Sequence, residues 1–472
     1  MQNRIQSTLL TFLLTVWCCV AAPAAYASFE KAMEIYSKGQ FVEAKNAFEA
    51  MSAIGDRASL FNLGVMYFRG EAVEPDPVKA YVFMTIANEG LNDESFSKIA
   101  KVIHGRLDEN QKSNVGTLYE ELYPIYGSEN IEDNIFPQLL DDEDCPPELQ
   151  PLRREPPVYP RSEAMMGSMG IVQAEFTVSP EGYAREIQVR SSTSRAFAKT
   201  SLNAIQSYRY NPTPNGVPII GHRLKIIYQM AMNKGDKVRA NPIVKVLNEL
   251  RTKSENGNVA AQYLYGESIN VYRHFQEFIK GVDFQDREAN VWFTKSAKAG
   301  LVNAQYEVGR NMLEGRGCAV DKVNGFKWIK AAAVGGFSPA QAYLATSEFS
   351  NQGVGKLSSR SKISWLRNAA QSDDFAPKAL LAWELIATSD ESLRNADEAL
   401  VLVSENSKIY RDDVRILETK AAAFALKGDF KKALKFQKLA FKAAEKRDWV
   451  IVRMQERLVA YQSEQAYIGA YY

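Results

Sequence analysis

The residues able to do acid–base, nucleophilic or metal chemistry are few and widely separated in this sequence. It has three histidines in 472 residues, His104, His222 and His274, and no two of them have the spacing of metal ligands. Histidine is the usual general base for a serine or cysteine nucleophile, and no motif places one for that role. Neither a Walker-type phosphate loop nor a GxGxxG turn after a strand is present. The sequence therefore predicts a protein that is not an enzyme and that uses no metal or cofactor.

The charged residues indicate neither a calcium site nor nucleic-acid binding. The acidic run at 141–144 lacks the alternating ligands and the glycine of a calcium loop, and Pro146-Pro147 follows it. We interpret 128–154 as an acidic, proline-containing linker. The formal net charge is +1, from 57 basic and 56 acidic residues, and no basic stripe is interleaved with aromatic residues. Nucleic acid is therefore not an expected partner.

Residues 1–27 have the pattern of a secretory signal peptide. Arg4 supplies the positive start, Leu9–Val20 the apolar core and Ala25-Tyr26-Ala27 the cleavage site. The apolar run is shorter than the about 20 residues needed to span a bilayer, and Pro23 follows it. Cleavage before Ser28 is therefore favoured, and an uncleaved N-terminal anchor is the alternative.

Two cysteines, Cys145 and Cys318, remain after that cleavage. An oxidising compartment permits one disulfide between them. They fall in different predicted domains, so separate thiols are favoured and the pairing stays open. Cys318 falls in a predicted loop between helices, where we expect it to be exposed.

One interval of the chain has the period of β-strands, and the remainder after residue 27 is typical of helix. Apolar residues alternate along 169–178, and a tight turn at Ser179–Gly182 leads to a second alternating run at 185–190. A helix containing Phe197 follows, and the Asn211–Gly216 segment ends it because proline lacks an amide donor. A last strand is predicted at about Arg223–Met230. The interval therefore predicts a small α+β domain with a three-stranded antiparallel sheet.

That element order resembles the C-terminal domain of the TonB family of periplasmic energy transducers. The resemblance covers residues 155–232, and it is carried by Tyr159-Pro160, Gly170–Phe176, Ser179-Pro180-Glu181-Gly182, Ser191-Ser192, Phe197, Ser207-Tyr208-Arg209-Tyr210-Asn211-Pro212 and Gly216-Val217-Pro218. The resemblance implies a periplasmic location in a Gram-negative cell.

The resemblance also implies a way of binding, in which a short extended segment of a partner pairs with an exposed strand of this domain. The last strand is the expected edge, because no fourth strand is evident before Ala231. The expected partner-binding residues are Tyr159, Pro160, Arg161, Arg223, Leu224, Lys225, Ile226, Ile227 and Tyr228. The alternative is that Tyr159 packs only on the core and that helical repeats cover the edge.

Helical repeats are predicted on both sides of this domain, so the expected fold class is mostly α, with solenoids flanking a small α+β domain. Residues 28–127 contain a tetratricopeptide-like pair followed by a unit, Gly55–Gly90, that resembles the Sel-one-like repeat. Further Sel-one-like repeats are predicted at 245–400. We expect Gly64 and Gly309 in the first helices of their units, packed closely against the second helices.

Residues 401–472 are predicted to contain a tetratricopeptide-like repeat and a C-terminal cap. The two tetratricopeptide-like pairs share a pattern of small and aromatic packing residues, at Ala32, Tyr36, Gly39, Phe41, Ala44 and Ala47 in the first and at Ala421, Ala425, Gly428, Phe430, Ala433 and Ala440 in the last. The many lysines of 417–440 are interpreted as a solvated helix face rather than a ligand site.

Together these features predict a periplasmic scaffold that binds envelope proteins, with TonB-dependent receptors among the candidates, and that meets a membrane only through its partners or an uncleaved anchor. Solenoids offer long surfaces for peptides and proteins. The alternative function is a TonB-type energy transducer in transport across the outer membrane. The N-terminal apolar segment has no histidine or acid, and helical repeats stand where the family has a proline-rich spacer. The scaffold is therefore favoured.

Overall fold

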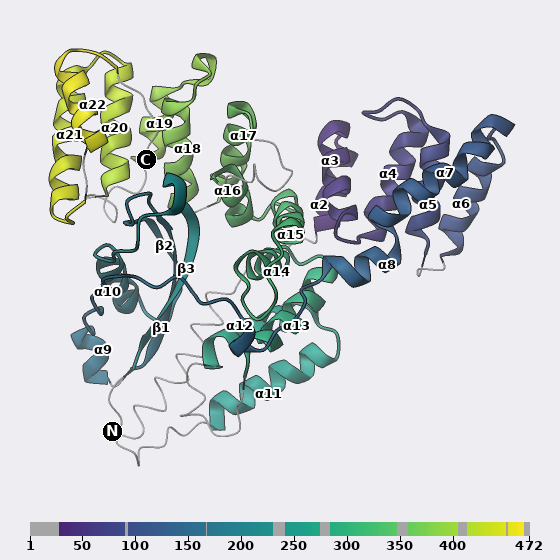
Figure 1. The fold of residues 1–472 in the computed structure, drawn as a ribbon, viewed down its shortest axis with the longest axis horizontal. Coiled ribbons are helices and arrows are strands. Elements are labelled where there is room, and N and C mark those ends of the chain that lie inside the picture. The colour runs from purple at the N-terminus through teal and green to yellow at the C-terminus, as the bar shows by residue number, and fades with distance from the viewer. Residues whose placement is uncertain are drawn as a thin grey trace. The chain divides into compact units, whose positions relative to one another are not determined.

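The structure is a computed structural model that describes residues 28–89, 93–166, 168–229, 241–273, 284–346, 357–372, 374–404, 413–449 and 452–466 (Figure 1). As predicted, the chain is mostly helical with one small three-stranded antiparallel sheet. It divides into two compact units. The described residues of 22–147 and 240–340 form one unit, and those of 148–239 and 341–472 form the other. The predicted signal peptide lies outside the described residues.

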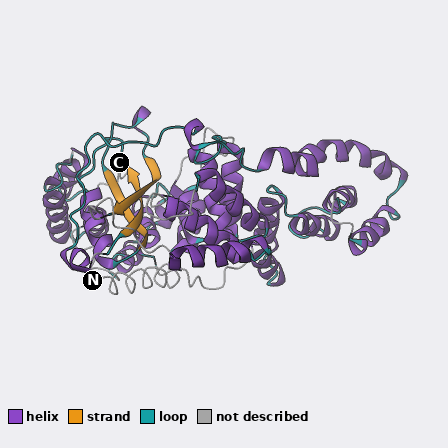
Figure 2. Ribbon diagram, turned by 90° about the horizontal axis from the view of Figure 1, so that it is seen from below, coloured by secondary structure: helices purple, strands orange, loops and turns teal. Residues whose placement is uncertain are grey.

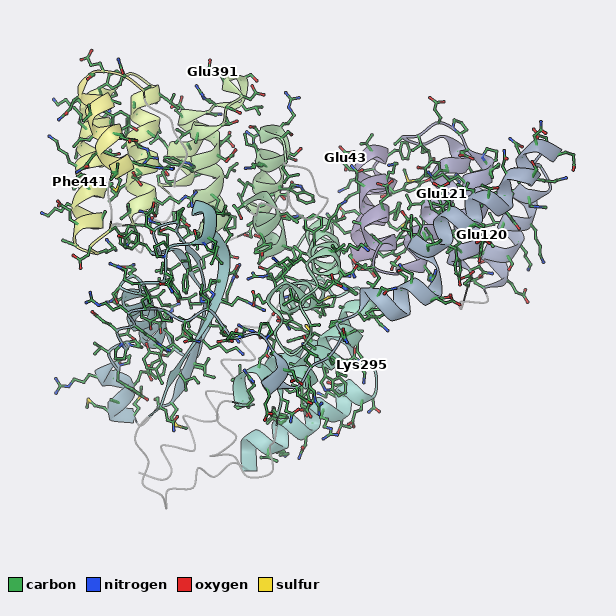
Figure 3. All side chains as sticks on the ribbon, viewed as in Figure 1. Glu43, Glu120, Glu121, Lys295, Glu391 and Phe441 are labelled. Carbon is green, nitrogen blue, oxygen red and sulfur yellow. The ribbon has the colours of Figure 1, made fainter. Side chains whose placement is uncertain are left out.

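The first unit consists of helices from two separate stretches of the chain. The N-terminal stretch contains α2 (Ser28–Ser37), α3 (Phe41–Ser52), α4 (Arg57–Arg69), α5 (Pro77–Ala87), α6 (Glu94–His104), α7 (Glu109–Tyr126) and α8 (Ser128–Asn130). The central stretch contains α11 (Asn241–Glu255), α12 (Val259–Tyr272), α13 (Asp286–Lys298), α14 (Val302–Glu314) and α15 (Lys322–Val334). Glu43 on α3 and Glu120 and Glu121 on α7 are exposed (Figure 3).

Aspartates set the starts of several of these helices. The side chain of Asp56 accepts a hydrogen bond from the backbone N–H of Ser59, at 2.6 Å, and Asp76 accepts one from Lys79, at 2.9 Å. An N-cap carboxylate satisfies a backbone donor that the helix leaves without an internal partner. Gly70 ends α4 in the left-handed conformation, with φ of 72°, which glycine adopts at little cost.

Two glycines allow the helices of a repeat to approach closely. A Cβ at Gly64 in α4 would lie 2.8 Å from Met84 Cγ and 3.0 Å from the carbonyl oxygen of Ala80, both in α5. A Cβ at Gly309 in α14 would lie 2.6 Å from the carbonyl oxygen of Gly325 in α15. At each glycine the shortest of these distances is too short for a Cβ, which confirms the predicted positions of these glycines.

The segment after α8, which the sequence predicts to be part of a linker, contacts α15. Ile131 and Ile135, at the two ends of a π-helix (Ile131–Ile135), are buried. The indole N–H of Trp328 donates a hydrogen bond of 2.8 Å to the carbonyl oxygen of Ile135. Leu140 then donates its backbone N–H to Gly317, at 3.2 Å. This part of the interval 128–154 is therefore held against the central helices of its own unit.

The two cysteines lie in the same unit. Cys318 pairs with Leu139 in an isolated β-bridge and is fully buried, so the expectation that Cys318 is exposed is wrong. The loop sequence around Cys318 gives no sign of the segment 138–140 that covers it. No disulfide joins Cys318 to Cys145 in this structure.

The sheet lies in the second unit and contains β1 (Gly170–Val178), β2 (Ala184–Ser192) and β3 (Ile219–Tyr228) in the order β2-β1-β3. Both pairings are antiparallel. Strand β3 begins at Ile219, earlier than predicted, because it continues to pair until Ile219 meets Val178. Figure 2 shows the three strands, in orange, grouped together. Helices α9 (Arg161–Met166) and α10 (Arg195–Ile205) belong to the same domain.

The turn between β1 and β2 depends on a glycine. Gly182 has φ of +87°, and a Cβ there would lie 2.2 Å from the carbonyl oxygen of Tyr210. The backbone N–H of Tyr210 donates to the carbonyl oxygen of Gly182, at 2.8 Å. The Pro180–Gly182 turn is thus tied to the segment after α10.

The second unit continues with helices toward the C-terminus. These are α16 (Ser338–Thr346), which begins at the end of the first unit, and then α17 (Ser359–Ala369), α18 (Phe375–Ala387), α19 (Ala396–Leu402), α20 (Val414–Leu426), α21 (Phe430–Glu445) and α22 (Val452–Gln462). An ion pair between Arg457 of α22 and Glu418 of α20 is buried, with 2.8 Å between the guanidinium nitrogen and the carboxylate oxygen. Within the described residues, no helix is both long and apolar enough to cross a membrane.

Candidate functional site

The candidate site is the strand β3 and the chain that precedes β1. Strand β3 stands last in the order β2-β1-β3, so it is an edge of the described sheet. Its side chains alternate between the two faces. Ile226 and Tyr228 are buried in the core of the domain, and Leu224 packs against that core. Ile227 is 37% exposed.

Tyr159 packs on the core of the domain rather than projecting from it. Its ring lies edge-on to Phe197, with the centroids 5.5 Å apart, and edge-on to Tyr228, at 5.6 Å. Its hydroxyl donates to the backbone carbonyl of Ser168. Burial, together with the nearby Glu163 carboxylate, raises the pKa of the Tyr159 hydroxyl, which therefore stays protonated as a donor. Tyr159 joins the segment before β1 to the end of β3.

The other expected site residues divide by exposure. Arg161, the first residue of α9, is exposed, while Pro160 is half-buried beside Tyr159. On β3, Arg223 and Lys225 are half-buried. The side chains of Arg161 and Ile227 are thus the most exposed of the set.

Tyr228 is fixed from the side of α10. Its hydroxyl lies 2.7 Å from Thr200 Oγ1 and 2.8 Å from Ser201 Oγ, both on that helix. Hydrogen bonds of this kind give a buried hydroxyl its partner and fix the ring. The end of β3 is therefore tied to both α10 and Tyr159, which makes its position rigid.

The opposite edge of the sheet contacts the C-terminal helices of its own unit. Glu186 of β2 and Arg415 of α20 form an ion pair of 3.0 Å in which both side chains are 11% exposed. The guanidinium of Arg185 lies 4.5 Å from the ring centroid of Trp449, and Tyr183 lies 6.0 Å from the same ring. Sequence reasoning missed these contacts, since nothing in the strand pattern shows which distant helix meets β2.

The described residues offer no metal centre: they contain no group of three or more histidine, cysteine, aspartate or glutamate side chains able to hold an ion. The arrangement around β3 consists of a strand edge, fixed aromatic rings and exposed flanking side chains. An edge strand of this kind can pair with an extended segment of another polypeptide.

Comparisons with known proteins agree with this geometry. Residues 155–230 match the family described as Gram-negative bacterial TonB protein C-terminal. Residues 57–90, 259–301 and 302–336 match the Sel1 repeat. The chain therefore contains a TonB C-terminal domain together with Sel1 repeats, as the sequence resemblance predicted.

The chain is similar to Protein TonB of Pseudomonas aeruginosa, with 32% identity over 88 residues. That match covers 18% of this chain, and the chain spans only 26% of its curated relative. Among solved structures, the TonB C-terminal domain of Pseudomonas aeruginosa has 29% identity and a TM-score of 0.17, and the match covers 19% of this chain and 93% of that one. A Sel1 repeat protein of Oxalobacter formigenes has 20% identity and a TM-score of 0.32, with coverage of 44% and 85%.

Proposed function

We propose that this protein is an interaction scaffold of the Gram-negative envelope, located in the periplasm, that binds partner proteins through its TonB C-terminal domain and its helical repeats. The observation that carries the proposal is the strand order β2-β1-β3, which leaves β3 at an edge in a domain of the TonB C-terminal family. An edge strand is a template on which an extended segment of another chain adds a strand.

The rigid end of β3 and the exposed side chains beside it favour this strand as the place of binding. The start of β2 is engaged by Arg415 and Trp449 of its own chain. Strand β3 is rigid at its Tyr228 end, and rigidity reduces the entropy lost when a partner binds. Arg161 and Ile227 then provide exposed side chains beside the added strand.

Photo-crosslinking in Gram-negative cells tests this proposal. A benzophenone amino acid replaces Ile227 or Arg161 in the full chain, and crosslinked proteins are identified by mass spectrometry. Lys199, which is exposed on α10 of the same domain, provides the matched control position. Replacing Ile226 by proline is a poorer test, because that side chain is only 1% exposed and its loss would damage the core.

We expect positions 227 and 161 to capture the same envelope protein and position 199 to capture none of it. Equal capture at all three positions, or no capture at 227, would contradict binding at β3. The captured protein, together with a transport assay in a deletion strain, also separates the scaffold from the energy transducer. A transducer would crosslink to an outer-membrane transport receptor, and its transport would stop when the chain is deleted.

A further inference from the structure

A second surface lies within the unit that contains the sheet, and no residue of β3 lines it. A cavity of about 780 Å³ is lined by residues just before the sheet domain, by the end of α10 and the chain after it, and by helices α20 and α21. Its lining includes six cationic side chains, Arg153, Arg209, Lys420, Lys442, Lys446 and Arg447, and two carboxylates, Glu155 and Asp448. We call this surface the basic groove.

Two arginines hold the walls of the basic groove together. Arg209 donates from Nη1 to the backbone carbonyls of Ser207, at 3.1 Å, and Tyr208, at 3.0 Å, and it also donates to the carbonyl of Arg447. Arg447 donates from Nε to the side-chain oxygen of Gln206, at 3.2 Å. These bonds tie the TonB C-terminal domain to the end of α21, so the groove is preformed.

The three lysines of the groove differ from Arg153 in their ionic contacts. Among the described residues, Lys420, Lys442 and Lys446 have no carboxylate within ion-pair distance, whereas Arg153 pairs with Glu155. Lys420 is half-buried. Cations gathered in a cleft attract anions more strongly than isolated surface charges do. The lysines therefore give the groove an unbalanced positive potential.

The groove also has an apolar wall. Phe436 and Leu439 of α21 line it together with Ala443, and Leu439 is 44% exposed. Phe436 also packs against a buried cluster that includes Val414 and Met454, as does Phe441 of the same helix, which is labelled in Figure 3. Helix α21 thus has one side in a core and presents another to the groove. A fitting ligand carries both negative charge and apolar side chains.

We propose that the basic groove binds an acidic peptide segment of a partner protein, with carboxylates toward Lys420, Lys442 and Lys446 and apolar side chains against Phe436 and Leu439. A small inorganic anion would leave the apolar wall and most of the cavity unused. The inference rests on the proposed role in protein binding, but it does not depend on strand addition at β3.

Fluorescence anisotropy with the full chain tests the inference. The probe is a short fluorescein-labelled peptide in which glutamate alternates with leucine, and the control peptide has glutamine in place of glutamate. The variant Lys442→Gln/Lys446→Gln removes two charges from the groove. Its matched control, Lys431→Gln/Lys438→Gln, removes two charges from exposed positions of α21 that do not line the groove. Circular dichroism checks that both variants keep the fold.

We expect the groove variant to bind the acidic peptide on the order of tenfold more weakly than the wild type and the control variant to bind it unchanged. The glutamine peptide should bind weakly to all three proteins. Equal weakening in both variants would overturn the inference, and so would displacement of the peptide by inorganic phosphate at the peptide's own concentration. Binding of anionic phospholipid vesicles at Lys442 and Lys446 without peptide binding would assign the groove to lipid instead. Each of these failures would leave crosslinking at position 227 unaffected.

Discussion

The first and the last helix pairs of the chain have the same packing pattern but place their charges at different depths. In α2–α3, Ala32 and Ala44 are fully buried, and in α20–α21 Ala421 and Ala433 are fully buried. Gly39 and Gly428 end the first helix of each pair, both with φ of +73°. Small residues therefore let both helix pairs approach closely.

The ionic contacts of the two pairs differ. Glu34 of α2 is partly exposed and pairs with Lys31, at 2.8 Å, and with Lys38. Glu418 of α20 pairs with Arg457 of α22, and both side chains are 1% exposed. The shared sequence pattern therefore determines how the two helices of each pair pack. The contact with α22, in contrast, determines how much folding free energy is lost when the charge at Glu418 is removed.

The largest expected effect is at the buried pair. Replacing Glu418 by leucine removes the carboxylate that forms an ion pair with the buried Arg457 guanidinium, which costs about 3–5 kcal/mol of folding free energy. The measurement is chemical denaturation of the full chain followed by circular dichroism. As controls, the double variant Glu418→Leu/Arg457→Met should recover most of the loss, and Glu34→Leu should change stability little. Equal losses in Glu418→Leu and Glu34→Leu would remove the distinction between the two helix pairs.

The next largest loss of stability is expected in the Sel1 repeats, where Gly64 and Gly309 lie at close helix contacts. We expect Gly64→Val and Gly309→Val to destabilise their repeats by about 1–3 kcal/mol through overpacking. Gly309→Val should cost more, since its Cβ would meet the backbone oxygen of Gly325, whereas at Gly64 the nearest atom belongs to the flexible side chain of Met84. Thermal melting of the two variants measures this order. An unchanged melting curve for either would refute its close helix contact.

A smaller and equal effect is expected at the glycines that end the first helices. Alanine at Gly39 or Gly428 would be held at positive φ, where a Cβ is strained, at a cost of roughly 1 kcal/mol. Among the described residues, no neighbouring atom lies within 4 Å of the point that a Cβ would occupy at either glycine, so the backbone alone sets this cost. Denaturation midpoints of the two variants should shift alike. A clear inequality would show that the two pairs do not share the same turn.

The smallest effect on stability is expected at the exposed charges. The hydrogen bond from Lys31, followed by that from Lys38, lowers the pKa of Glu34 from 4.5 to about 2. Because the folded-state pKa lies below the unfolded value, the stabilisation is present above pH 4.5 and is lost as the pH falls from there to about 2. Titration of the Glu34 carboxyl by nuclear magnetic resonance measures this pKa. Lys31→Gln should raise it toward 4.5, and a titration that the substitution leaves unchanged would contradict the contact.

Much of the fold followed from local patterns in the sequence. Strand alternation along 169–178 and the spacing of glycine and alanine in the repeats depend on near neighbours, and both predictions were confirmed. The buried state of Cys318 and the early start of β3 were not predicted, because each depends on a partner far along the chain.

In the candidate site too, some features could be predicted from the sequence and others could not. The position of β3 at an edge follows from the number and order of the strands. That Tyr159 packs on Phe197 and Tyr228 was only the alternative interpretation, since sequence does not show which way an aromatic ring turns. The lysines of 417–440 were interpreted as a solvated face, and the sequence does not show that Lys420 lines the basic groove with residues from a different region of the chain. The binding of a partner in the basic groove remains a proposal.

Amide hydrogen exchange of the full chain measures most directly whether partners bind the TonB C-terminal domain at β3. The exchange is compared with and without the envelope protein captured by crosslinking at position 227. We predict slower exchange for the amides of Ile219–Tyr228 on binding, while those of β2 remain unchanged. Protection confined to the helical repeats, or equal protection of β2 and β3, would contradict strand addition at β3.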